Sequence, residues 1–174
     1  MSLGKPTLTL SGTYTLDPLA DVIEYWIEYL DLDLSIRVTQ YAQLFQQLLD
    51  PTSALCRNQA GANAVFLRWA DFVPHRSESL AGHFAWSDLE PRVAEIASAL
   101  TSFSHAVPCL VLVGPSDRED PVLERATSEL QDRLAGAPNL FVDRGERAMT
   151  RYGIVQRADP YTMAADYLSK GLYD

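Results

Sequence analysis

The chain has 174 residues, 47% of them hydrophobic, and a formal net charge of −9 with a pI near 4.7. This size and composition fit one domain with a substantial core and exclude a disordered chain. The acidic balance, without a cluster of Lys and Arg, argues against nucleic-acid binding, and no apolar run approaches the ~20 residues that span a bilayer.

The first structural signal is an apolar, β-prone run at Leu8–Leu10, which ends in the small and hydroxyl residues Ser11-Gly12-Thr13. A helix signal follows, because Asp17 can cap the first free amide groups and Pro18 at the first helical position gives up no needed hydrogen bond. Over Pro18–Leu30 the apolar residues have the spacing of one buried helical face, formed by Leu19, Val22, Ile23, Trp26, Ile27 and Leu30.

Strand and helix signals then alternate to the end of the chain. In order, we expect a strand at Ser35–Thr39, a helix at Tyr41–Leu49, a strand at Ala62–Trp69, a helix at Trp86–Phe103, a strand at Val107–Val113, a helix at Pro121–Leu134 and a strand at Asn139–Val142. The strands are continuous apolar runs, which predicts burial on both faces. We therefore predict an α/β fold: a three-layer α/β/α sandwich with about five parallel strands, in which Leu8–Leu10 is central.

The organisation is that of one unit. We expect residues 1–4 to be a leader left from expression and residues 5–174 to form a single domain. No signal peptide is visible, and Cys56 and Cys109 stand in contexts typical of reduced thiols, so we expect a cytoplasmic protein.

The carboxyl ends of parallel strands form the edge where open α/β sheets bind ligands. The polar or small residues expected at this edge are Ser11, Gly12, Thr13, Tyr14, Gln40, Tyr41, Arg68, Asp71, Ser116, Asp117, Asp143 and Arg144. Ser11 or Thr13 could be the nucleophile of a hydrolase or acyltransferase, or could simply cap or fill a turn. Arg68 lies in an apolar strand, so we expect a carboxylate partner from Asp71 or Asp17 and a loss of stability in Arg68→Leu.

The simplest role of Ser116 and Asp117 is to form a turn and cap the next helix. Hydroxyl catalysis normally needs an imidazole within hydrogen-bond reach. Of the three histidines, His105 precedes a strand, at the opposite edge of the sheet. His75 and His83 fall in a polar segment that could lie over the carboxyl edge, where the strand ends form the predicted ligand crevice. No metal-ligand spacing and no glycine-rich phosphate loop appears, so we expect no metal and no cofactor.

Four segments follow one another as in a known type of domain: Gly12–Leu19, Tyr41–Pro51, Asn63–Phe72 and Val107–Ser116. Over most of its length the chain resembles the SGNH/GDSL-hydrolase-like domain that precedes the phosphatase-like part of FkbH-like proteins. Similar domains stand inside modular polyketide and nonribosomal peptide synthases. The resemblance implies a flavodoxin-like sheet and a place in a natural-product assembly line.

The catalytic blocks of that family are altered in this sequence. Thr13 stands where the family has its serine nucleophile, Arg68-Trp69-Ala70-Asp71 replaces a Gly-x-Asn-Asp block, and the C-terminal Asp-x-x-His motif has no counterpart near Asp159-Pro160. The paired aspartates of the FkbH phosphatase motif are absent from the sequence as well.

We therefore predict an auxiliary domain without standard hydrolase activity, which positions an acyl or peptidyl carrier protein or a neighbouring synthase domain. Carrier proteins are usually acidic, so the net charge of −9 argues against carrier docking through charge complementarity. The alternative function is an acyl hydrolase or acyltransferase that acts on a carrier-tethered thioester through Thr13 or Ser11. In a noncatalytic domain we expect these hydroxyls to bond backbone or Asp17, and Tyr14 and Tyr41 to fill the crevice.

Overall fold

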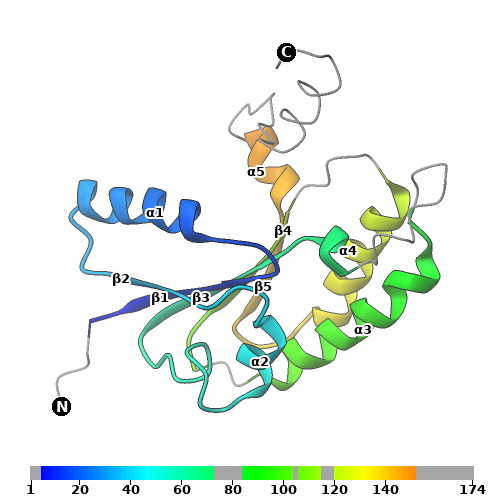
Figure 1. Ribbon diagram of the computed structural model, residues 1–174, viewed down its shortest axis with the longest axis horizontal. Helices are drawn as coiled ribbons and strands as arrows, with labels where there is room; N and C mark the ends of the chain where they lie inside the picture. The colour runs from blue at the N-terminus through cyan, green and yellow to red at the C-terminus, as the bar shows by residue number, and fades with distance from the viewer. Residues whose placement is uncertain (1–4, 73–83, 104–105, 115–119, 152–174) are drawn as a thin grey trace, which may run out of the picture.

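The computed structural model describes residues 5–72, 84–103, 106–114 and 120–151. Its five strands are all parallel and form one sheet in the order β2-β1-β3-β4-β5 (Figure 1). They are β1 (Thr7–Gly12), β2 (Ser35–Val38), β3 (Gly61–Leu67), β4 (Cys109–Val113) and β5 (Leu140–Arg144). The predicted five-stranded parallel sheet is confirmed. β1 lies inside the sheet with a neighbour on each side, but β3 rather than β1 takes the middle position.

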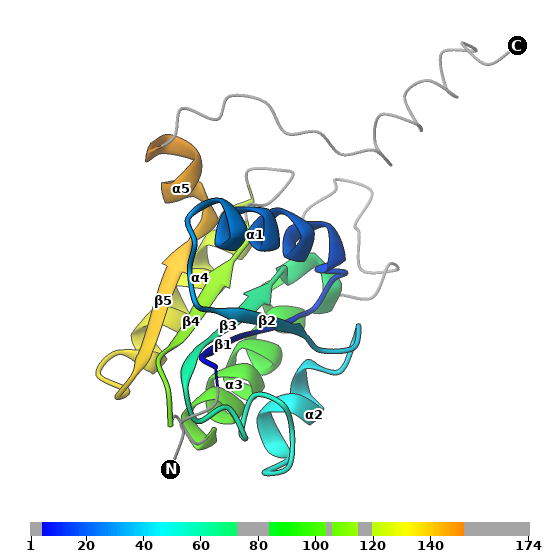
Figure 2. The ribbon, with the colours of Figure 1, turned by 90° about the vertical axis from the view of Figure 1, so that its left-hand side faces the viewer.

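Helices flank both faces of the sheet (Figures 1 and 2), which confirms the sandwich architecture. α1 (Asp17–Tyr29) lies on one face, and α2 (Leu44–Leu49), α3 (Trp86–Ser102) and α4 (Pro121–Leu134) lie on the other. A short 3-10 turn, η1 (Trp69–Phe72), follows β3, and α5 (Gly145–Arg151) follows β5. No helix in the described part of the chain is both long and apolar enough to cross a membrane.

The two faces of the sheet are buried to different extents. The larger core lies between the sheet and α2–α4, and it takes alternate residues of β4, so that Cys109 and Val111 are fully buried. Leu110, between them, points to the α1 face and is 37% exposed, and Phe141 on β5 is 58% exposed. The expectation that every strand is buried on both faces is therefore wrong for β4 and β5, because α1 covers only part of its face.

The start of α1 differs from the prediction by one residue. Leu16, not Asp17, is the residue that precedes the helix, and its carbonyl accepts hydrogen bonds from the N–H groups of Leu19 (3.0 Å) and Ala20 (2.9 Å). Asp17 is the first helical residue and makes no side-chain cap. The reason is packing: the Leu16 side chain is 3% exposed, anchored in the smaller core with Leu10, so the helix begins directly after it.

The predicted buried face of α1 is too wide. Only Ala20 is buried, and Ile23 and Ile27 are partly buried, whereas Val22 and Trp26 are at least half exposed. A helix that packs on one side of a sheet buries only a narrow stripe at spacings of three and four residues. The apolar residues outside that stripe remain on the surface of the described structure.

Of the other boundaries that differ from the predictions, two bear on the candidate site. α2 begins at Leu44 rather than Tyr41, because Ala42 has a positive φ of 60°, which a helix cannot continue through. β3 ends at Leu67, so Arg68 stands just after the strand rather than within it.

Candidate functional site

The carboxyl edge of the sheet gathers most of the predicted site residues. Ser11 and Gly12 end β1, Thr13 and Tyr14 follow in the turn before α1, and Arg68 follows β3. Ser116 and Asp117, like the three histidines His75, His83 and His105, lie outside the described residues.

Both candidate nucleophile hydroxyls are already hydrogen bonded. The Ser11 Oγ accepts from the Thr39 hydroxyl at 2.9 Å, and Ser11 is 1% exposed. The Thr13 Oγ1 accepts from the backbone N–H of Arg68 at 3.0 Å, and the Thr13 N–H donates to the Phe66 carbonyl at 3.0 Å. Ser11 therefore ties β1 to the end of β2, and Thr13 ties β1 to the end of β3.

Gly12 permits the close approach of β1 and β3. A Cβ at this position would lie 3.0 Å from the Phe66 carbonyl oxygen and 3.2 Å from the Leu16 side chain. Contacts this short are tighter than nearly all Cβ contacts in proteins, so the neighbouring groups would have to give by a few tenths of an ångström. The glycine in this block is thus explained by packing at the strand end.

The predicted carboxylate partner of Arg68 is Asp71. The Arg68 Nε and terminal nitrogen donate to one Asp71 carboxylate oxygen at 2.9 and 2.6 Å. Nearly half of the Arg68 side chain is exposed (49%), because it stands beyond the end of β3. The expected pairing is confirmed, but the expected burial among apolar neighbours is wrong.

Tyr14 lies across the strand ends. The Arg68 guanidinium lies 5.4 Å from the centre of the Tyr14 ring, and the Tyr14 hydroxyl is 3.9 Å from where a Cβ would stand at Gly114, after β4. Burial raises the pKa of the Tyr14 phenol, Arg68 lowers it in part, and Asp71 raises it. Tyr14 thus occupies the predicted crevice, whereas Tyr41 is 66% exposed and does not fill it.

The end of β5 is tied to α4. Arg144 donates to the Gln131 side-chain oxygen at 3.1 Å and to the Ser128 hydroxyl at 2.8 Å. Asp143 accepts from the Arg144 backbone N–H at 2.8 Å and lies 3.8 Å from Arg147. These groups fix the last strand against its neighbours.

Asp120 is a polar residue near this edge that the sequence reasoning missed. It is 3% exposed, and its two carboxylate oxygens accept from the backbone N–H groups of Val122 (2.8 Å) and Phe84 (3.2 Å). Asp120 therefore caps α4, the role that the sequence analysis gave to Ser116 and Asp117. The sequence signal that could have identified this cap is the pair Asp120-Pro121, because it repeats the Asp17-Pro18 pair at the start of α1.

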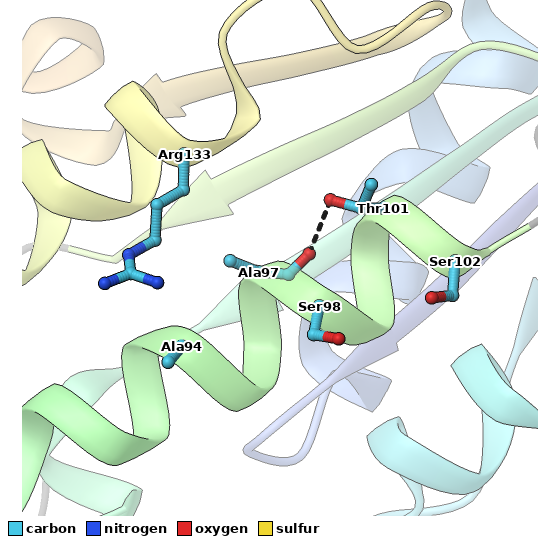
Figure 3. Close-up of a pocket in the computed structure, with 6 residues that line it drawn as sticks. All are labelled: Ala94, Ala97, Ser98, Thr101, Ser102 and Arg133. Carbon is cyan, nitrogen blue, oxygen red and sulfur yellow. Dashed lines mark hydrogen bonds between the residues drawn. The ribbon is translucent and has the colours of Figure 1, made fainter.

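A shallow hollow of about 330 Å³ lies elsewhere, at the C-terminal ends of α3 and α4 (Figure 3). Its lining comprises Ala94, Ala97, Ser98, Thr101, Ser102 and Arg133. The Thr101 hydroxyl donates to the Ala97 carbonyl at 2.7 Å, and Arg133 pairs with Glu129 at 2.9 Å. Since α3 and α4 run antiparallel to the strands, this hollow lies toward the opposite edge from the predicted crevice.

Among the described residues, no cluster of three or more His, Cys, Asp or Glu could hold a metal ion.

Comparisons with known proteins add the fold relationship. No protein-family model matches the sequence, and no curated protein matches it. The fold is similar to that of the N-terminal part of the protein BF1531 from Bacteroides fragilis, a crystal structure described as containing a phosphatase domain complexed with Mg. The TM-score is 0.66 at 15% sequence identity, over 97% of this chain and 46% of that one. The chain thus spans less than half of the length of that structure, and the likeness shows a shared α/β fold.

Proposed function

We propose that this chain is an auxiliary, noncatalytic SGNH-like domain of the kind associated with FkbH-like proteins, and that it positions a neighbouring domain or a carrier protein in a polyketide or nonribosomal peptide assembly line. The observation that carries this proposal is that the Ser11 and Thr13 hydroxyls are both engaged in hydrogen bonds within the fold. Ser11 is 1% exposed and bonded to Thr39, and the Thr13 hydroxyl is bonded to the Arg68 backbone. A nucleophile needs an accessible oxygen with a base in reach.

The occupied crevice supports the same proposal. Tyr14 and the Arg68–Asp71 pair lie together at the strand ends, where the alternative function would place a substrate acyl group. Small-molecule sites are concave and largely preformed. The fold similarity to a larger structure that contains a phosphatase domain supports a domain that works beside another one.

The proposed absence of catalysis is tested by a turnover assay. The purified chain is offered short p-nitrophenyl esters and acyl-pantetheine thioesters, beside Thr13→Ala and Ser11→Ala, with circular dichroism to confirm folding. We expect no turnover above the buffer rate. Turnover that disappears in either variant would assign the alternative function, an acyl hydrolase or acyltransferase. Turnover that survives in both variants would equally overturn a noncatalytic role.

The positioning half is tested by binding. The carrier domain and the catalytic domain encoded nearest to this chain are titrated separately into it by calorimetry. Binding of either one supports the proposal. The absence of binding to both would refute it, whatever the turnover assay gives.

A further inference from the structure

α1 carries an exposed stripe of large apolar side chains. Val22, Tyr25, Trp26 and Tyr29 are 54%, 59%, 50% and 68% exposed, and their spacing places them on one side of the helix. The rings contact one another: Tyr25 and Tyr29 stack at 6.0 Å, and Trp26 meets Tyr29 edge-on at 5.6 Å. We name these four residues the aromatic stripe. Large apolar side chains gathered in this way mark an interaction site more often than scattered ones do.

The sheet beside α1 is open as well. Leu10, Ala64, Leu110 and Phe141 pair in one row across β1, β3, β4 and β5, and their exposures are 0%, 6%, 37% and 58%. The α1 face of the sheet is therefore buried at β1 and β3 but increasingly exposed at β4 and β5. Figure 1 shows α1 over the β1 and β2 side of the sheet. With a right-handed β1–α1–β2 crossover, helical geometry turns the Trp26 flank of α1 toward β4 and β5. The stripe and the open strands thus border one apolar surface.

The other exposed flank of α1 is acidic. Asp17, Asp21, Glu24 and Glu28 recur at helical spacing, all four are exposed, and residues 6–36 contain no Lys or Arg. Within the described residues, none of these four carboxylates forms an ion pair. No basic residue stands in the last turn of α1, where a cation would complement the helix dipole. Asp17 in the first turn suits the helix dipole, but the carboxylates of Glu24 and Glu28 stand toward the C-terminal end, where negative charge does not stabilise the helix. Their charge can therefore complement a partner.

We propose that the aromatic stripe and its acidic flank bind an amphipathic helix of a partner protein, whose apolar face is bordered by Lys and Arg. The inference rests on the proposed positioning role and names the chemistry of the partner surface. Charge complementarity selects this occupant, since a second copy would bring two acidic flanks together and an acidic carrier protein would be repelled. On this face the partner is therefore a neighbouring domain or a linker with a basic helix.

The test uses the full chain and a synthetic helical peptide of about 18 residues with a leucine face bordered by lysines. A peptide with the same leucines and glutamates in place of the lysines is the matched probe. We expect the lysine peptide to bind at moderate salt and to bind more weakly as salt rises, whereas the glutamate peptide does not bind. Equal binding of both peptides would overturn the assignment of a basic partner.

Variants distinguish binding at the aromatic stripe from nonspecific attraction of a basic peptide to an acidic protein. The double variant Trp26→Ala/Tyr29→Ala should weaken binding about tenfold or more, because clustered aromatic side chains dominate helix-in-groove contacts. The control Tyr41→Ala/Leu49→Ala removes two apolar side chains that are 66% and 60% exposed elsewhere, and it should change binding by less than about twofold. Equal losses in the two double variants would overturn the proposal.

A photo-crosslinking residue at position 29 of the full chain distinguishes the occupants. Crosslinks to the lysine peptide, reduced by an excess of unlabelled peptide, support the proposal. Crosslinks to a second copy, or to residues 152–174 of the same chain that the peptide cannot displace, would overturn it. Because none of these readouts involves turnover, this inference can fail while the noncatalytic role stands, and the reverse also holds.

Discussion

The substitution Thr13→Val asks whether the first-strand hydroxyl is structural. Valine keeps the shape of threonine, so the change removes chiefly the acceptor of the 3.0 Å bond from the Arg68 backbone N–H. A typical hydrogen bond contributes about 0.5–1.5 kcal/mol net, and water replaces part of it here because this bond lies at an exposed position. We therefore expect the free energy of unfolding to fall by about 1 kcal/mol, which lowers Tm by about 2–4 °C in a chain of this size.

The measurement is urea denaturation followed by circular dichroism, with the midpoint and the slope fitted together. Thr13→Ser keeps the acceptor and should lose less than about half of that free energy. Thr15→Val is the matched control, since Thr15 is exposed and the same chemical change is made two residues away. If Thr13→Val is as stable as the parent chain, or if Thr15→Val loses as much, the structural role of the Thr13 hydroxyl is refuted.

Three further substitutions or reactions test other parts of the structure. Arg68→Leu should lower the free energy of unfolding in urea by less than about 1 kcal/mol, because its pair with Asp71 is half exposed; a loss above about 2 kcal/mol would contradict this. Gly61→Ala should lose more than about 3 kcal/mol or fail to fold, because the residue has a φ of +111° and the new Cβ would clash with the backbone of Thr7 on β1; a parent-like urea midpoint would contradict it. Burial raises the pKa of the Cys109 thiol to about 12 from an ordinary 9.0, so iodoacetamide at about pH 8 should label Cys56 and spare Cys109 in the folded chain. Because the folded chain disfavours the Cys109 thiolate, the free energy of unfolding should be unaffected by this thiol below pH 9.0 and should fall as the pH rises from 9.0 toward 12. Equal labelling of both thiols would refute the account.

A buried amide pair illustrates what local patterns do not reveal. Asn63 on β3 is 1% exposed, donates to the Leu55 carbonyl at 3.1 Å and accepts from Asn58 at 2.9 Å. Asn58 also donates to the Thr7 carbonyl at 3.0 Å, 51 residues away. The sequence placed Asn63 correctly in a strand, but only the strand register decided that its amide would join the loop before β3 to β1.

The amino-acid sequence by itself determined the five strands, the helices α1–α4 and their order, since local signals carry them; η1 and α5 were not among the predicted elements. Pro121–Leu134 is helical with the bounds that its pattern predicts. For Arg68 the sequence left two candidate partners, Asp71 and Asp17, and the structure selects Asp71. Tertiary structure alone decided which side of α1 is buried and which strands it leaves open, because that depends on where the helix sits on the sheet. It also decided the partners of the two hydroxyls, Thr39 and Arg68, which lie 28 and 55 residues from them and meet them only through the pairing of parallel strands.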